Sequence, residues 1–104
     1  MAALTNIYRA GAGFKILHTT RRTHTASMPL DPNESSGEKP NKHPESDQVL
    51  IVLEGTTTAE ISGERAKMEK GDAVTIPAGT PHKFTNAGTD RAVTFSVYSP
   101  PAYR

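Results

Sequence analysis

The chain reads G-D-A-V-T-I-P-A-G-T-P-H-K-F-T-N at residues 71–86, and this segment predicts two strands joined by a turn. Gly71 suits a tight turn, because glycine adopts a positive φ without a steric penalty. The strand after it ends at Pro77, which has no N–H to donate to a sheet ladder. A second strand then begins, and its alternation places three side chains on one face: His82, Phe84 and Asn86.

Five residues of this segment stand at fixed spacings, in the pattern G-x5-P-x-G-x2-H-x3-N: Gly71, Pro77, Gly79, His82 and Asn86. The pattern resembles the second signature motif of the cupin superfamily at all five positions. The resemblance implies an all-β fold, a single antiparallel cupin barrel of the jelly-roll type, with His82 as a ligand of a metal site inside it. Without a second motif, a lone histidine at a strand start is more often a surface or core residue.

The resemblance implies a first motif upstream, and residues 41–55 match it with N-K-H-P-E-S-D-Q-V-L-I-V-L-E-G. Gly55 fixes the register, so that Gln48 takes the position of the family's glutamate. His43 then takes the position of its second histidine, and Asn41 that of the first. The metal ligands implied by the resemblance, where the family has His-His-Glu-His, are therefore Asn41, His43, Gln48 and His82.

A rival register starts from Gly37 and places His43 and Glu45 at the two histidine positions. It leaves only two residues between Glu45 and Gln48, fewer than the family pattern allows. We prefer the register in which Asn41 and His43 are the pair, and Pro44 supports it, because the resemblance implies a proline after the second histidine in small cupins. Residues two apart on a strand face the same side, so Asn41 and His43 could converge on one ion.

The implied ligand set is neutral, because amides stand in place of a carboxylate and one imidazole. Amide oxygens are weaker ligands than imidazole for the later first-row metals, and loss of the carboxylate removes an attractive charge. We therefore expect a labile divalent ion, with iron, manganese, zinc or nickel as the candidates. The alternative is a relic pocket in which the two histidines and two amides hydrogen-bond to one another without a metal.

Three further side chains are expected to line the pocket. Phe84 lies two residues beyond His82 on the same face of its strand. Tyr98 belongs to the last predicted strand and His24 to the second, and both could reach the barrel interior. Solvent exposure or core packing would explain these three patterns equally well. Asp47 is expected to face away from the ligands, as a turn or surface carboxylate.

The 104 residues are expected to form one cupin domain, with the first motif at about residues 37–55 and the second at 71–86. A loop rich in Pro, Ser and Gly is predicted at 31–40, and a two-residue hairpin turn at Gly63-Glu64. Strands are predicted where alternating or apolar runs lie between turn residues, at 14–18, 22–30, 48–53, 56–62, 65–69, 72–76, 82–86 and 92–98.

Composition argues against several classes of function. The chain has no cysteine, which removes disulfides, thiolate chemistry and thiolate metal sites. Its net charge is +1, with basic residues scattered singly, which argues against nucleic-acid binding. The longest apolar run, residues 49–53, is too short to cross a membrane, and residues 1–15 lack the apolar core of a secretory signal. A cytoplasmic protein is therefore expected.

A homodimer is the expected oligomeric state. A chain of this size gains from association, and Val49, Ile51 and Leu53 give the central strand a second apolar face that needs cover. The resemblance implies pairing through sheet faces or through an exchanged N-terminal strand, here residues 4–8.

Two functions agree with the expected site. The resemblance implies a metal-dependent enzyme, of the dioxygenase or isomerase type, acting on a small polar or anionic molecule. The metal would be its Lewis acid or oxygen-activating centre, but the sequence places no carboxylate securely in the pocket as a general base. The second function is a non-catalytic module that binds or senses a small ligand at a degenerate metal site.

Overall fold

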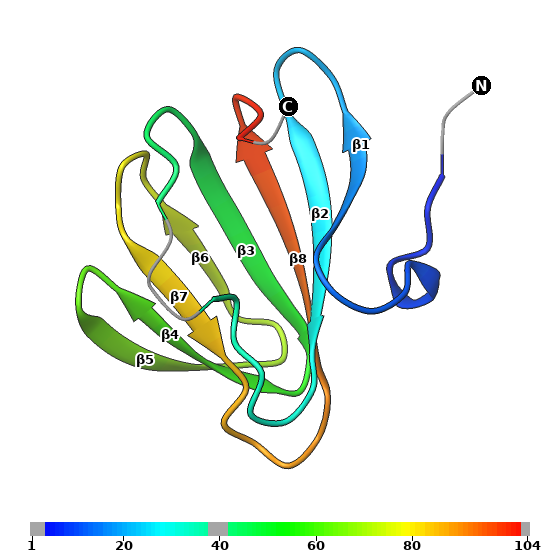
Figure 1. Ribbon diagram of the computed structural model, residues 1–104, viewed down its shortest axis with the longest axis vertical. Coiled ribbons are helices and arrows are strands. Elements are labelled where there is room, and N and C mark those ends of the chain that lie inside the picture. Colours follow the sequence, from blue (N-terminus) through cyan, green and yellow to red (C-terminus); the bar gives the residue numbers. More distant parts are fainter. Residues whose placement is uncertain (1–3, 38–41, 103–104) are drawn as a thin grey trace.

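The protein is described by a computed structural model over residues 4–37 and 42–102, and it is built almost entirely of antiparallel strands (Figure 1). A short 3₁₀ helix, η1 (Ile7–Arg9), comes first and is capped by the side chain of Asn6. The strands that follow are β1 (Lys15–Thr19), β2 (His24–Leu30), β3 (Asp47–Glu54), β4 (Thr56–Ile61), β5 (Glu64–Glu69), β6 (Ala73–Ile76), β7 (His82–Thr85) and β8 (Ala92–Ser99).

The strands form two sheets that pack face to face. The larger sheet has the order β1-β2-β8-β3-β6, and the smaller sheet, at the lower left of Figure 1, has the order β5-β4-β7. Crossovers such as β2 to β8 and β4 to β7 are typical of a jelly roll, and the predicted fold class is confirmed. Within residues 4–37 and 42–102, no strand pairing joins one sheet to the other, so the barrel is open rather than closed. The same residues contain no helix with the length and apolarity needed to span a membrane.

All eight strands predicted from the sequence are present, each within two residues of its predicted bounds. The predicted hairpin turn was wrong by one residue, because Ser62 and Gly63, with φ of 51° and 81°, form the turn and Ile61 pairs with Glu64. Two successive positive φ values give a type I′ turn, which matches the twist of the strands it joins. The N-terminal segment contains η1 at residues 7–9, in place of the extended strand suggested for residues 4–8.

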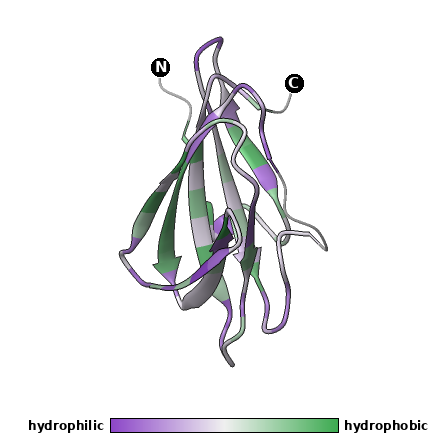
Figure 2. Cartoon of the chain, turned by 90° about the vertical axis from the view of Figure 1, so that its left-hand side faces the viewer, coloured by the Kyte–Doolittle hydropathy of each residue, from purple (hydrophilic) through white to green (hydrophobic). Residues whose placement is uncertain are grey.

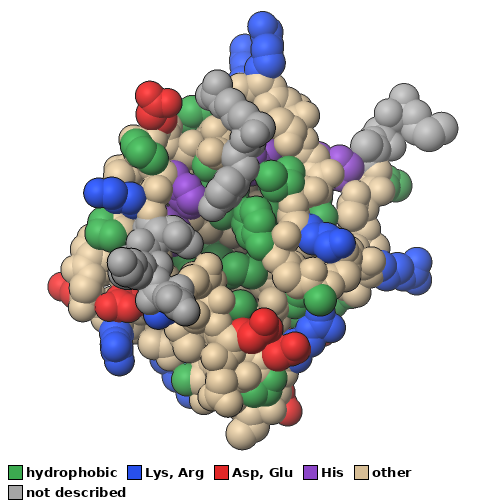
Figure 3. Space-filling model, in the orientation of Figure 1, with side chains coloured by type: hydrophobic (Ala, Val, Ile, Leu, Met, Phe, Trp, Pro, Cys, Tyr) green, Lys and Arg blue, Asp and Glu red, His purple; other side chains and the backbone are tan. Residues whose placement is uncertain are grey.

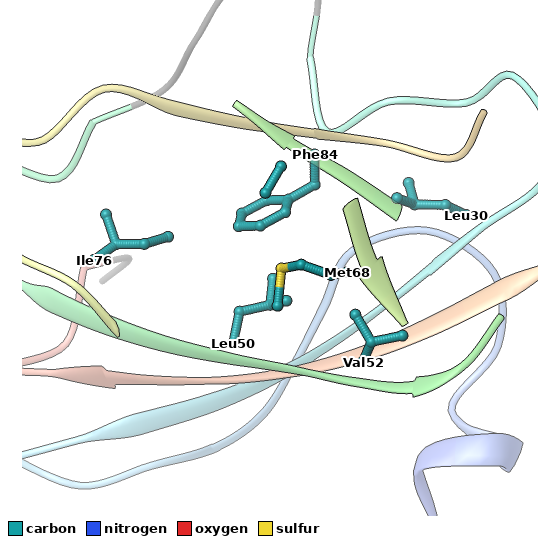
Figure 4. Close-up of a cluster of buried hydrophobic side chains, with 7 residues drawn as sticks. Leu30, Leu50, Val52, Met68, Ile76 and Phe84 are labelled. Carbon is teal, nitrogen blue, oxygen red and sulfur yellow. The ribbon is translucent and has the colours of Figure 1, made fainter. Parts of the chain in front are cut away.

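A hydrophobic core fills the space between the sheets (Figure 4). Phe84 and Leu50 are among its largest fully buried side chains, and burying each contributes about 1.5–3 kcal/mol relative to exposure. Hydrophobic positions recur on the strands of both sheets, interrupted by polar ones (Figure 2). The core consists of Leu30, Leu50, Val52, Ala59, Met68, Ile76 and Phe84.

The inward-facing row of β3 runs from polar to apolar. Gln48 comes first, and Leu50 and Val52 follow it on the same face, all three buried. On the neighbouring strand β8, Tyr98 is the register partner of Gln48, and Ser96 is that of Leu50. One end of the interior is therefore lined by polar side chains on a rigid sheet, and this is where the candidate site lies.

A candidate metal and ligand site in the sandwich interior

A cavity of about 240 Å³ adjoins the core, since Phe84 belongs to both. Figure 3 shows hydrophobic and histidine side chains gathered around a hollow on this face of the molecule. The side chains that line the cavity come from both sheets and from the segments before β1 and β3: Phe14, Met28, Ser36, His43, Gln48, His82, Phe84 and Tyr98.

His82 is buried at the first residue of β7, and its ring is held by its own turn. Its Nδ1 lies 2.9 Å from the carbonyl oxygen of Thr80, which can only accept. Nδ1 therefore carries the proton, and in the neutral ring Nε2 keeps its lone pair. A histidine whose Nδ1–H donates to a backbone carbonyl is oriented in the way that metal-ligating histidines usually are.

His43 lies in the loop before β3 and is tied to the turn that leads to His82. Its carbonyl oxygen accepts from the N–H of Gly79 at 2.8 Å. The carboxylate of Asp47 accepts from the N–H of Ala78 at 2.8 Å, so this exposed side chain fixes the same turn and has the turn role expected for it. The two connections hold both histidine-bearing segments together.

The rings of His43 and His82 have centroids 5.1 Å apart. Burial lowers the pKa of His43 below its ordinary value of 6.5, and the nearby charges of protonated His82 and His24 lower it further. Both effects favour the uncharged imidazole of His43 at neutral pH.

Gln48 is buried at the start of β3, and only one end of its amide is hydrogen-bonded. Its Nε2 donates to the hydroxyl of Ser96 at 3.1 Å. Its Oε1 is fully buried and has no hydrogen-bond partner among the described residues. A buried carbonyl oxygen without a partner is costly, and a bound cation or hydroxyl group would relieve that cost.

Of the other residues expected at the site, one lines the cavity, one is buried beside it and one is outside the described residues. Tyr98 lines the cavity, with its ring at right angles to that of His43 and the centroids 5.2 Å apart. His24 is fully buried and packs its ring edge-on against Tyr98, with the centroids 4.7 Å apart, and it does not itself line the cavity within the described part of the chain. Asn41, expected as a fourth ligand, lies outside the described residues.

The asparagine of the downstream motif has a structural role. Asn86 is fully buried, and its Nδ2 donates to the carbonyl oxygens of Leu30 at 2.9 Å and Asp90 at 2.8 Å. Its Oδ1 accepts from the N–H of Gly88 at 2.9 Å. These bonds join the end of β2 to the loop between β7 and β8, which accounts for an amide at this position.

The sequence matches the profile of the cupin domain over residues 26–98. The chain belongs to the cupin family.

This cupin is similar to several known proteins. It is 28% identical over 109 residues to the tetracenomycin polyketide synthase protein TcmJ of Streptomyces glaucescens, a match that covers 100% of the chain and 72% of TcmJ. It is 38% identical over 48 residues to an uncharacterized protein of Methanocaldococcus jannaschii, which covers 46% of the chain and 38% of that protein. A solved structure from Bacillus halodurans superposes with a TM-score of 0.86 at 27% identity, covering 94% of the chain and 77% of that structure.

Imidazole nitrogens and an amide oxygen are donors that a divalent metal ion accepts, and the two rings lie close enough to share one ion. Two imidazoles on one tetrahedral ion have ring centroids roughly 5 Å apart, as those of His43 and His82 do. Oε1 of Gln48 adds an oxygen donor. In the described part of the chain, no three His, Cys, Asp or Glu side chains come together in a way that could hold a metal. The described donors therefore amount to two imidazoles and one amide oxygen, a weak set.

Sequence reasoning missed three of the residues that line the cavity. Met28 lies two residues beyond Ala26 on the inward face of β2, so strand alternation could have indicated it. Ser36 accepts from the N–H of Phe84 at 3.0 Å, and Phe14 precedes β1. Both lie in irregular segments, where no periodicity shows which way a side chain points.

Proposed function

We propose that this cupin holds a labile divalent ion with His43, His82 and Gln48 and binds a small molecule at that ion. The observation that carries the proposal is the pairing of the His43 and His82 rings, with centroids 5.1 Å apart, in a cavity that Gln48 also lines; Oε1 of Gln48 has no hydrogen-bond partner among the described residues. Asn41 is the proposed fourth ligand, on the strength of the first motif. Iron, manganese, zinc and nickel all accept imidazole and amide donors.

The metal, when bound, would act as a Lewis acid that polarises a carbonyl or hydroxyl oxygen of the bound molecule. The protein's own residues orient and desolvate the reactants. Thr80 fixes the ring of His82 through its carbonyl oxygen, and Ser96 fixes the amide of Gln48. We propose an enzyme of the isomerase or dioxygenase type. The similarity to a polyketide synthase protein, over the whole chain and 72% of that protein, supports a small organic molecule as its substrate.

A second candidate function is a non-catalytic binding module. It is favoured by one observation, that no carboxylate lines the cavity within the described residues. Without such a group, proton transfer would depend on the imidazoles themselves or on Tyr98. Neutral amides and imidazoles bind hydroxyl groups well without performing chemistry.

Metal titration of chelator-treated protein tests the proposal. Calorimetry with Zn²⁺ should give one site per chain in the wild type, and His43→Gln and His82→Gln should each abolish or strongly weaken it. His18→Gln changes a histidine of β1 that does not line the cavity, and it should leave the titration unchanged. Equal binding by all four proteins would show that the ion binds elsewhere.

We also propose that two copies pair through the outer face of the larger sheet. On that face Val49 is the register partner of Val97, and Ile51 is that of Phe95. Val49 is 36% exposed and the other three are half-buried, which leaves an apolar strip that association would cover. Sedimentation at micromolar concentration should give twice the chain mass, and Val49→Lys should lower it. A monomer mass for the wild type would contradict the proposal.

A further inference from the structure

We infer that the cavity takes a small ring compound with a hydroxyl group, of the phenol or enol class, and not a phosphorylated or polyanionic molecule. The inference rests on the proposed function in that it concerns the same cavity. It is carried by the composition and size of the cavity wall and by the buried Oε1 of Gln48, which has no hydrogen-bond partner among the described residues.

The described residues of the cavity wall carry no side-chain charge of the kind that fixes a phosphate. Among the described residues that line it, none is Lys, Arg, Asp or Glu. Lys42 and Glu45 instead line a neighbouring hollow, which shares His43 with this cavity. Phosphate groups are bound by arginine forks, lysines or clusters of backbone N–H groups. A metal ion could balance one ligand oxygen, but the other oxygens of a phosphate would be left against apolar side chains.

The apolar part of the wall suits a flat ring. Phe14, Met28 and Phe84 supply two aromatic rings and a flexible thioether, which packs well against aromatic edges. A cavity of about 150 Å³ is known to hold benzene, so the 240 Å³ here have room for one ring or two fused rings. A sugar ring, with hydroxyl groups on all sides, would leave most of those groups without partners against this wall.

The polar part of the wall suits one or two oxygens at one end of the ligand. Oε1 of Gln48 is buried without a hydrogen-bond partner in the described structure, and a ligand hydroxyl could donate to it after a small rotation of the amide toward the cavity. The neutral imidazole of His43 lies on the same wall. A phenol therefore finds an acceptor in the metal-free protein, and a bound ion would take the phenol oxygen in its place.

Phe14 is the residue that should set the preference for a ring. Unlike Phe84, it lies outside the core, in the segment before β1, and 41% of it is exposed. Replacing Phe14 by alanine should reduce the contact with a bound ring compound without disturbing the packing between the sheets. Ile16 offers a matched control, because it is 43% exposed, lies two residues away and does not line the cavity.

Chemical-shift titration with three probes tests the inference: 2-naphthol, phenol and glucose 6-phosphate. Each is added to chelator-treated protein and to Zn²⁺-treated protein, and amide shifts of ¹⁵N-labelled protein are followed. We expect 2-naphthol to bind both forms, with saturable shifts at residues around the cavity and tighter binding than phenol. Phe14→Ala should weaken 2-naphthol binding about tenfold, and Ile16→Ala should not change it.

The outcomes separate this inference from the proposed function. If 2-naphthol binds with the expected Phe14 dependence while Zn²⁺ does not bind, the ring preference stands and the metal proposal fails. If Zn²⁺ binds at His43 and His82 but 2-naphthol does not bind, the ring preference is overturned alone. Tighter binding of glucose 6-phosphate than of 2-naphthol, or 2-naphthol shifts that do not depend on Phe14, would also overturn it.

Discussion

The N–H of Gly79 donates to the carbonyl oxygen of His43 at 2.8 Å, so the turn before one imidazole is fixed to the residue that carries the other. A second bond, from the N–H of Ala78 to the carboxylate of Asp47, ties the same turn to the first residue of β3. The spacing between the two candidate ligands is therefore set by backbone geometry and by one exposed carboxylate outside the cavity.

Asp47→Ala should loosen this connection. We expect the free energy of unfolding to fall by about 1–2 kcal/mol, because a charge-assisted hydrogen bond is lost, and metal affinity to fall with it. Asp72→Ala is the matched control, since Asp72 accepts from the N–H of Glu69 at 2.8 Å in a turn that does not carry a candidate ligand. Urea unfolding and Zn²⁺ calorimetry on both variants check the prediction. A similar loss of affinity in the two variants would argue against a positioning role for Asp47.

His43 should make the protein less stable in mild acid. Its pKa is lowered in the folded state, so below pH 6.5 the unfolded chain binds a proton that the folded chain resists. The contribution of His43 is therefore constant above that pH and increasingly destabilising as the pH falls below it. His43→Gln should flatten the fall in melting temperature between pH 7 and pH 5, and His18→Gln should not. An unchanged slope in His43→Gln would contradict the burial of this imidazole.

Gln48→Glu should raise the affinity for a metal ion and lower the stability of the metal-free protein. The new carboxylate would attract the ion, and affinity should rise about tenfold, equivalent to about 1.4 kcal/mol. Without an ion the same carboxylate is buried beside the hydroxyl of Ser96, with no cation to balance its charge, so the melting temperature at pH 7 should fall.

Thr75→Glu is the control for Gln48→Glu. It adds the same charge on β6 at an exposed position that does not line the cavity, and it should leave affinity unchanged. Calorimetry with Mn²⁺ measures both variants. Equal affinities for Gln48→Glu and the wild type would mean that the amide does not face the ion.

Gly55 should tolerate no side chain, because its backbone lies against the start of β8. With φ at 74°, a Cβ would lie 2.8 Å from the carbonyl oxygen of Arg91 and 2.9 Å from Cα of Ala92. Gly55→Ala should cost about 2–4 kcal/mol in urea unfolding. Gly63→Ala has a similar φ of 81° but open space, and it should cost about 1 kcal/mol. Equal losses of unfolding free energy in the two variants would show that the positive φ alone explains the need for glycine at position 55.

The sequence predicted the strands well because their signals are local. Alternation along β3 and turn residues such as Gly55 and Pro77 depend on a few neighbouring residues. The hairpin at Ser62 was misplaced by one residue, because a type I′ turn accepts a serine with positive φ that propensity disfavours. Whether the barrel is open or closed depends on which strands pair across the two sheets, and local sequence patterns do not predict that pairing.

The candidate site was only partly predictable. Family spacing indicated His43, Gln48 and His82, and all three line one cavity. Spacing gave no sign of Phe14, which reaches the cavity from an irregular segment, nor of the hydrogen bond that Gln48 donates to Ser96. His24 was expected in the cavity wall, but tertiary packing buries it against Tyr98. Such contacts depend on which side chains two distant strands bring together.

The central claim is that His43 and His82 bind the same ion, and pulsed electron paramagnetic resonance of Mn²⁺-loaded protein tests it most directly. The electron spin echo of bound Mn²⁺ is modulated by the nitrogens of coordinated imidazoles. The wild type and His18→Gln should both show coupling to two histidine nitrogens. His43→Gln and His82→Gln should each retain one at most. Bound Mn²⁺ with no histidine coupling, or with the same coupling in all four proteins, would contradict the account.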